Sequence, residues 1–265
     1  MAVSERSMVG GPIAGVDPVA ILAGRMGDTA LVLGHRISEW CGLAPALEED
    51  IALANTALDL IGQAKLWLDL AGAREGLGRD ADGLAYLRDA WDFRNLLLVE
   101  RPNGDFGDTI LRQALFDGWH VQLLAGLRDS SDEQVAAIAA KASKEAAYHW
   151  QRSRETVIAL GDGTEESHAR MQAALVRAWP FVGEMFESDE TDAALSSAGI
   201  APAPATLSTS VMGAFEEMLA EATLRAPEVS RWQTGGRSGR MHTEHLGHML
   251  STMQWLQRAY PGCDW

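Results

Sequence analysis

Four segments with helical spacing each carry one carboxylate among apolar residues, and these acids are the first candidates for chemistry. An unpaired carboxylate inside a helical core is costly, so each acid needs a metal ion or a polar partner. One acid from each of four helices is the framework of a di-iron bundle, in which two helices also carry a Glu-x-x-His pair. The acids that fit this framework are Glu39, Asp59, Asp117 and Glu145.

The histidines that would complete a di-iron site are displaced in two of these segments. Three residues after Asp59 the chain has Gly62, and three residues after Glu145 it has Tyr148, with His149 one position later. A one-residue shift turns a side chain by about 100° around a helix. We therefore expect His149 to miss the centre of the bundle.

One histidine does follow an acid at the three-residue spacing, because His120 lies three positions after Asp117. It falls on a helix for which the di-iron pattern requires only an acid. We therefore predict no metal site and no catalytic residue here, with the acids paired to basic or polar neighbours. An intact di-iron oxygenase site is the alternative. The predicted vestigial centre comprises Glu39, Asp59, Asp117, His120, Glu145 and His149.

Helical rather than alternating periodicity in the long segments predicts an all-α fold, a four-helix bundle with additional C-terminal helices. Residues 1–17 are expected to be a flexible leader, and residues 18–265 a single helical domain. The glycine-rich segment from Thr234 to Arg240 is expected to be a mobile surface loop. Helices are predicted at about 28–40, 48–71, 81–92, 108–127, 132–160, 165–186, between the proline-rich IAPAPATL and Pro227, and at 243–259.

The composition of the chain argues against several classes of protein. The chain has 265 residues and a net charge of −15, a field that repels nucleic acid. No apolar run reaches the ~20 residues of a membrane span, and the N-terminus lacks the basic and apolar regions of a signal peptide. Only Cys41 and Cys263 are present, so a disulfide framework is excluded and a cytoplasmic location is expected.

The C-terminal HTEHLGH places His242, His245 and His248 at three-residue intervals, which could suggest a metal cluster. No acid or cysteine elsewhere in the sequence is tied to these histidines, and the pattern is not His-Glu-x-x-His. We therefore expect them to cap and pack the start of a helix.

Several long strings in the chain are similar to those of one protein family. They are LVLGHRISEWCGLAPALEEDIALANTALDLIGQA, FRNLLLVERPNGDFGDTI, AKASKEAAYH, and TGG followed by HTEHLG and a DW end. In this order they resemble the structural (C) subunits of phenylacetyl-CoA epoxidases, over roughly Val19 to Trp265. The resemblance implies a ferritin-like fold and a role in aerobic phenylacetate degradation.

The resemblance also implies partners and cofactors. The chain would support a homologous catalytic (A) subunit, which carries the di-iron centre, together with a small (B) subunit. A reductase with flavin, iron–sulfur and NADPH would complete the monooxygenase complex, and this chain would hold no cofactor. Homo-oligomers are also possible, and an unrelated helical binding protein is the remaining alternative.

Two stretches are expected, from the resemblance, to contact phenylacetyl-CoA. In the first, the guanidinium of Arg94 suits a CoA phosphate, since such groups bind phosphate through paired N–H donors. The stretches correspond to Asp92, Phe93, Arg94 and Asn95, and to Ala193, Ala194 and Leu195.

Overall fold

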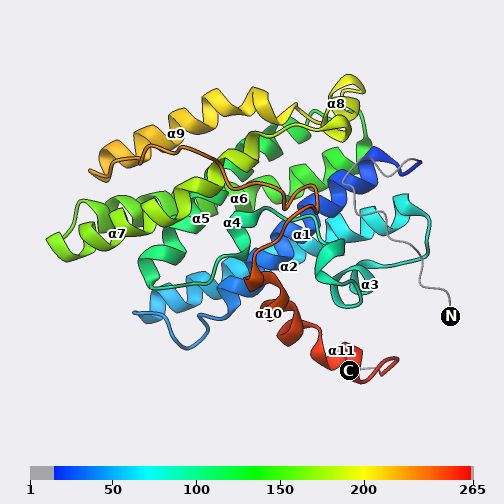
Figure 1. Cartoon of the computed structure of the whole chain (residues 1–265), viewed down its shortest axis with the longest axis horizontal. Coiled ribbons are helices and arrows are strands. Elements are labelled where there is room, and N and C mark those ends of the chain that lie inside the picture. The colour runs from blue at the N-terminus through cyan, green and yellow to red at the C-terminus, as the bar shows by residue number, and fades with distance from the viewer. Residues whose placement is uncertain (1–14, 264–265) are drawn as a thin grey trace.

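Four long helices form the body of the molecule in the computed structural model, which describes residues 15–263. They are α1 (Pro18–Ser38), α2 (Leu47–Glu75), α5 (Phe106–Leu127) and α6 (Glu133–Gly161). Helix α1 packs along α2, α5 packs along α6, and α2 also contacts α6 (Figure 1). All regular elements in the described residues are helical, so the predicted all-α class is confirmed.

The ends of these helices follow local chemistry. The side chain of Asp105 accepts the backbone N–H of Asp108 at the start of α5, and Asp132 caps α6 in the same manner. Helix α2 is followed by its C-cap residue Gly76, whose φ of 70° suits a residue without a Cβ. Helix α1 begins about ten residues earlier than predicted, because Asp17 caps it and proline occupies its first position.

Shorter helices surround the four long ones. Helices α7 and α9 pack on α5 and α6, α8 lies against α1, and the C-terminal α10 and α11 descend below the body in Figure 1. The shorter elements are α3 (Ala81–Tyr86), η1 (Ala90–Asp92), α4 (Leu97–Glu100), α7 (Glu165–Ala178), η2 (Trp179–Phe186), α8 (Glu190–Ser197), η3 (Pro204–Leu207), α9 (Ser208–Glu221), α10 (Glu244–Met253) and α11 (Trp255–Ala259).

Three of these elements, α4, α8 and η3, were not predicted from the sequence, since each is too short to show a clear helical period. The helix expected over 165–186 is divided. It ends as α7 at Ala178 and continues as the 3-10 turn η2, in which Pro180 lacks the N–H that an α-helix would use.

The glycine-rich segment is packed against the bundle, contrary to the mobile surface loop expected there. We call residues 234–243 the strap; it crosses in front of α1 as an orange trace in Figure 1. A Cβ added to Gly236 would overlap the carbonyl oxygen of Asn95, so only glycine permits this close approach. The backbone N–H groups of Gly235 and Arg237 are bound by the buried carboxylate of Glu184, 2.9 and 3.1 Å away.

Of the predicted leader, residues 1–14 lie outside the described part of the chain. Within that part, no helix combines the length and the apolar character needed to cross a bilayer.

Candidate functional site

The polar centre of the bundle joins α2 and α6 through Asp59 and His149. The Nε2 atom of His149 lies 3.0 Å from Oδ2 of Asp59. The histidine side chain is 1% exposed and the aspartate 38% exposed, so the pair runs from the interior to the surface. His149, which was expected to miss the centre of the bundle, is buried, while the neighbouring Tyr148 points outward and is 57% exposed.

Asp117 on α5 is the most deeply buried of the predicted acids, with 1% exposure. Its carboxylate accepts hydrogen bonds from Gln113 Nε2 at 2.7 Å and from Ser153 Oγ on α6 at 2.8 Å. Burial raises the pKa of Asp117 to about 6, against the lowering effect of His149 and the two hydrogen bonds. The protonated carboxyl is therefore favoured far more than in a free aspartate.

Two other members of the predicted set are less buried than Asp117. Glu145 on α6 is half-buried and accepts a hydrogen bond from Gln63 Nε2 on α2 at 2.8 Å. Glu39 is the exposed C-cap residue of α1, where Arg36 and Asn103 each donate to it at 3.0 Å. Glu39 is therefore not a member of the interior cluster.

The sixth predicted residue, His120, is buried against the ring of Phe116, with ring centroids 4.7 Å apart. Burial lowers the pKa of His120 to about 3, with a smaller contribution from the charge of His149. A side chain with this pKa is a neutral imidazole at physiological pH. The packing makes it part of the aromatic core beside Asp117.

The arrangement does not fit a di-iron centre. Among residues 15–263, no three or more His, Cys, Asp or Glu side chains are grouped so that they could hold a metal ion. The predicted acids are spread between a helix end, the interior and the surface. Gly62, which stands where the di-iron pattern has a histidine, has no side chain, and no atom lies within 4 Å of the position that a Cβ would take there. Their hydrogen bonds come from glutamine, serine and histidine side chains.

The first stretch with predicted substrate contacts forms a turn against α1. Phe93 and Asn95 are buried, whereas Asp92 and Arg94 are half-buried. The backbone N–H of Arg94 donates to Asp28 Oδ2 at 2.8 Å, and its guanidinium donates to backbone carbonyl oxygens nearby. Burial lowers the pKa of Arg94, and the carboxylates of Asp28 and Asp92 oppose that effect.

The second stretch lies on α8, where Ala193 and Ala194 are exposed and Leu195 is buried. Helix α8 is tied to α1 because Arg25 donates to Asp189 and to Asp192, in the latter case at 3.3 Å.

Helix α1 is thus the element that brings the two stretches together. Arg25 holds α8, and three residues later the buried Asp28 accepts two hydrogen bonds from Arg88 and one from Arg94. Residues three apart lie on neighbouring positions of one helix face. These ionic residues were not predicted from the sequence, although an isolated charge among apolar residues, such as Arg25 in ILAGRMGD, could have indicated them.

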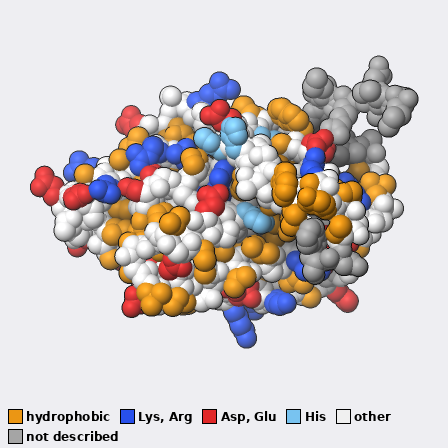
Figure 2. Space-filling model, turned by 90° about the horizontal axis from the view of Figure 1, so that it is seen from below, with side chains coloured by type: hydrophobic (Ala, Val, Ile, Leu, Met, Phe, Trp, Pro, Cys, Tyr) orange, Lys and Arg blue, Asp and Glu red, His pale blue; other side chains and the backbone are white. Residues whose placement is uncertain are grey.

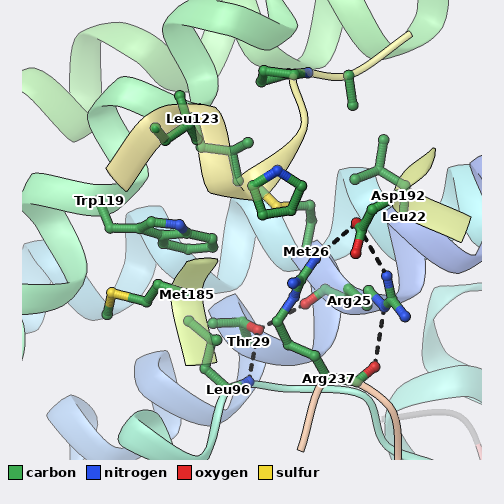
Figure 3. A pocket seen from close by; sticks show the side chains of 14 residues that line it. Leu22, Arg25, Met26, Thr29, Leu96, Trp119, Leu123, Met185, Asp192 and Arg237 are labelled. Atoms are coloured by element: carbon green, nitrogen blue, oxygen red, sulfur yellow. Dashed lines mark hydrogen bonds and ion pairs between the residues drawn. The ribbon is translucent and has the colours of Figure 1, made fainter. Parts of the chain in front are cut away.

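A small cavity of about 30 Å³ lies beside Arg25. Figure 3 shows Arg25 and Arg237 converging on Asp192 at one side, while Trp119, Leu123 and other apolar side chains line the opposite side. The guanidinium of Arg237 lies 3.0 Å from Asp192 and is nearly buried. Ion pairs therefore close the polar end of a mostly apolar cavity.

Large apolar side chains are also exposed outside the site. Leu47, Ile51 and Leu58 on α2 are 71%, 53% and 67% exposed, and their spacing places them on one face of the helix. A second group lies near the C-terminal helices, on the face viewed in Figure 2. It comprises Trp91, Met241, Trp255, Leu256 and Tyr260.

Comparison with known proteins connects this structure to one family. Residues 15–265 match the family model described as "Phenylacetic acid catabolic protein". The chain is also 51% identical, over 241 residues, to a protein of Escherichia coli (strain K12) described as the C subunit of 1,2-phenylacetyl-CoA epoxidase. The match covers 91% of this chain and 96% of that protein.

Proposed function

Because the chain belongs to the phenylacetic acid catabolic protein family, we propose that it is the non-catalytic, structural subunit of a phenylacetyl-CoA 1,2-epoxidase. The observation that carries this proposal is 51% identity to the C subunit of that enzyme along nearly the whole of both chains. The chain would then belong to a multicomponent, NADPH-dependent monooxygenase that acts in aerobic phenylacetate degradation.

The polar centre supports a structural rather than a catalytic role. Its acids are engaged by Gln63, Gln113, Ser153 and His149, so these carboxylates cross-link α2, α5 and α6. We propose that the four long helices keep a ferritin-like arrangement within a single domain over residues 18–265. In this arrangement, hydrogen bonds between helices take the place of metal coordination.

The partners in this proposal are the reductase that carries flavin and iron–sulfur, the small (B) subunit, and the catalytic di-iron (A) subunit. We propose that the exposed face of α2 formed by Leu47, Ile51 and Leu58 contacts the catalytic partner, since large apolar side chains are typical of interface cores. A cytoplasmic location fits the two free, exposed thiols of Cys41 and Cys263.

Substrate contact by the turn 92–95 and by residues 193–195 remains part of the proposal. It is supported by the attachment of both segments to α1 through Asp28 and Arg25. Arg94 would offer its guanidinium to a CoA phosphate. Its side chain is half-buried and is held by the carbonyl oxygens of Trp91 and Phe93, so it is already oriented without ligand.

Co-expression with the other subunits tests the structural role. We expect the wild-type chain to co-purify with its catalytic partner and to increase the epoxidation of phenylacetyl-CoA by that partner. Ile51→Asp and Leu58→Asp should lose the complex while keeping the wild-type melting temperature. Leu77→Asp, at a position 72% exposed just beyond α2, is the matched control and should still co-purify.

The alternative, a di-iron oxygenase in this chain itself, is tested by metal analysis. After expression with iron, the structural role predicts no stoichiometric iron in the purified chain. About two irons per chain, the stoichiometry of di-iron bundles, together with epoxidation by this chain and reductase alone, would overturn the proposed function.

A further inference from the structure

The strap is fixed at its C-terminal end by a buried carboxylate. Glu100, the last residue of α4, is 0% exposed. Its side chain accepts hydrogen bonds from Asn95 Nδ2 at 2.9 Å, from Thr243 N at 2.6 Å and from Thr243 Oγ1 at 2.7 Å. Glu100 therefore joins the strap to the turn that contains Phe93 and Asn95.

His242 of the strap lies between two hydrogen-bond acceptors. Its Nδ1 is 2.6 Å from Oε1 of Glu100, and its Nε2 is 3.1 Å from the carbonyl oxygen of Phe93. A carbonyl oxygen only accepts, and an ionised carboxylate only accepts, whereas a neutral imidazole carries a single N–H. With Glu100 ionised and His242 neutral, one of the two contacts would bring together two acceptors.

Both contacts are satisfied only when the pair holds one additional proton. The proton can reside on the imidazole, which then donates from both nitrogens, or on the carboxyl, which then donates to Nδ1 while Nε2 donates to Phe93. Both arrangements contain the same number of protons. The geometry therefore specifies the proton count of the closed strap, whichever atom carries the proton.

Two arginines from different elements lie near the pair. Arg36 on α1 donates to the backbone oxygens of Glu100 and His245, both at 3.0 Å. Arg94 of the turn lies against Gly239 of the strap. The ring of Trp91, 6.2 Å from the imidazole ring, covers His242 on another side.

We propose that Glu100 and His242 form a proton-dependent clasp that holds the strap closed over the 92–95 turn and releases it when the shared proton leaves. The direction follows from proton linkage. In an open strap a solvated histidine titrates near ~6.5, so opening at higher pH releases the proton that the closed clasp holds. Closure therefore weakens as pH rises, by about tenfold per pH unit while one proton is released.

The N-terminal end of the strap responds to acid instead. Glu184 accepts the N–H groups of Gly235 and Arg237, and burial raises the pKa of its carboxyl. Protonation of Glu184 weakens those hydrogen bonds as pH falls. The two ends of the strap therefore respond to pH in opposite directions, and the clasp is tested by a loss of protection toward alkaline pH.

Hydrogen exchange of the intact chain tests the clasp. Protection factors of the strap amides are measured from about pH 6.5, the pKa of an ordinary histidine, to about pH 9, with intrinsic exchange rates divided out. We expect them to fall by about tenfold per pH unit over part of this range. Amides in the middle of α5 are the internal reference and should keep constant protection factors.

Three single variants distinguish loss of the Glu100–His242 contact from a general loosening of the strap. His242→Gln and Glu100→Gln each remove the shared proton and should make the protection of the strap independent of pH. His248→Gln, at an exposed histidine on α10, is the matched control and should retain the wild-type slope. A wild-type strap with constant protection, or an equal slope in Glu100→Gln, would overturn the proposal. These measurements use neither substrate nor partner subunits, so the outcome is independent of the proposed function.

Discussion

The Nε2 atom of His149 on α6 lies 3.0 Å from Oδ2 of Asp59 on α2, a polar contact across the interface of two long helices. The imidazole is buried and the carboxylate is partly solvated. Removal of the histidine side chain and removal of the aspartate side chain should therefore lower the free energy of unfolding by different amounts. The histidine fills interior volume, while the aspartate orients it from the solvent side.

Replacing each partner of this pair should therefore give unequal effects on the free energy of unfolding. Asp59→Asn should cost less than about 1 kcal/mol, because an ion pair with one partly exposed member is screened by water. His149→Ala should cost about 2 kcal/mol or more, since removal of a buried ring leaves a cavity. Urea unfolding measures both, and equal losses would show that charge rather than packing dominates the contact.

Neutralising Asp117 should stabilise the protein near neutral pH. With a folded pKa of about 6 against 3.8 in the unfolded chain, the native state binds the extra proton. Stability is therefore highest below the unfolded pKa and falls as pH rises through the folded value, by roughly 3 kcal/mol at 1.36 kcal/mol per unit.

Asp117→Asn keeps a neutral side chain of the same shape, and its amide can still bond Gln113 and Ser153. We expect a higher melting temperature than wild type at about pH 8 and a smaller difference at about pH 4, following the titration of the aspartate. Ser153→Ala serves as the control for the hydrogen bond. An Asp117→Asn melting temperature below wild type at both pH values would contradict this prediction.

Two glycines of α2 should respond oppositely to alanine. Gly62 has no atom within 4 Å of an added Cβ, so Gly62→Ala should raise stability by about 0.5–1 kcal/mol through helix propensity. At Gly72 the added Cβ would overlap the carbonyl oxygen of Arg79. Gly72→Ala should lower the melting temperature because the connection after α2 must move. Thermal unfolding monitored by circular dichroism compares the pair.

The buried ion pair between Asp28 and Arg88 should be among the most sensitive contacts in the protein. Their side chains are 0% and 8% exposed, and Asp28 also accepts the N–H of Arg94. Asp28→Asn should cost about 3–5 kcal/mol, because it leaves a buried guanidinium without its counter-charge. Glu166→Gln, which removes an exposed pair with Arg170, is the control and should change stability by less than about 0.5 kcal/mol.

The helices themselves could be predicted because their signals are local. Asp132 and the glycines after Leu160 mark both ends of α6 in the sequence, and the structure begins this helix at Glu133 and ends it at Gly161. Caps, turns and a 3.6-residue period involve neighbours within a few positions, so they act in any chain context. The helical spacing of the apolar residues likewise predicted the all-α class from the sequence alone.

Only the tertiary structure decided which polar residues face one another. The buried His149 contacts Asp59 from 90 positions away, and His242 contacts Glu100 from 142 positions away. Periodicity places side chains on one face of a helix but does not specify how that helix is rotated against its neighbours. That rotation depends on the packing of all the surrounding side chains together. The residues that pair in the polar centre and in the strap could therefore be identified only from the tertiary structure.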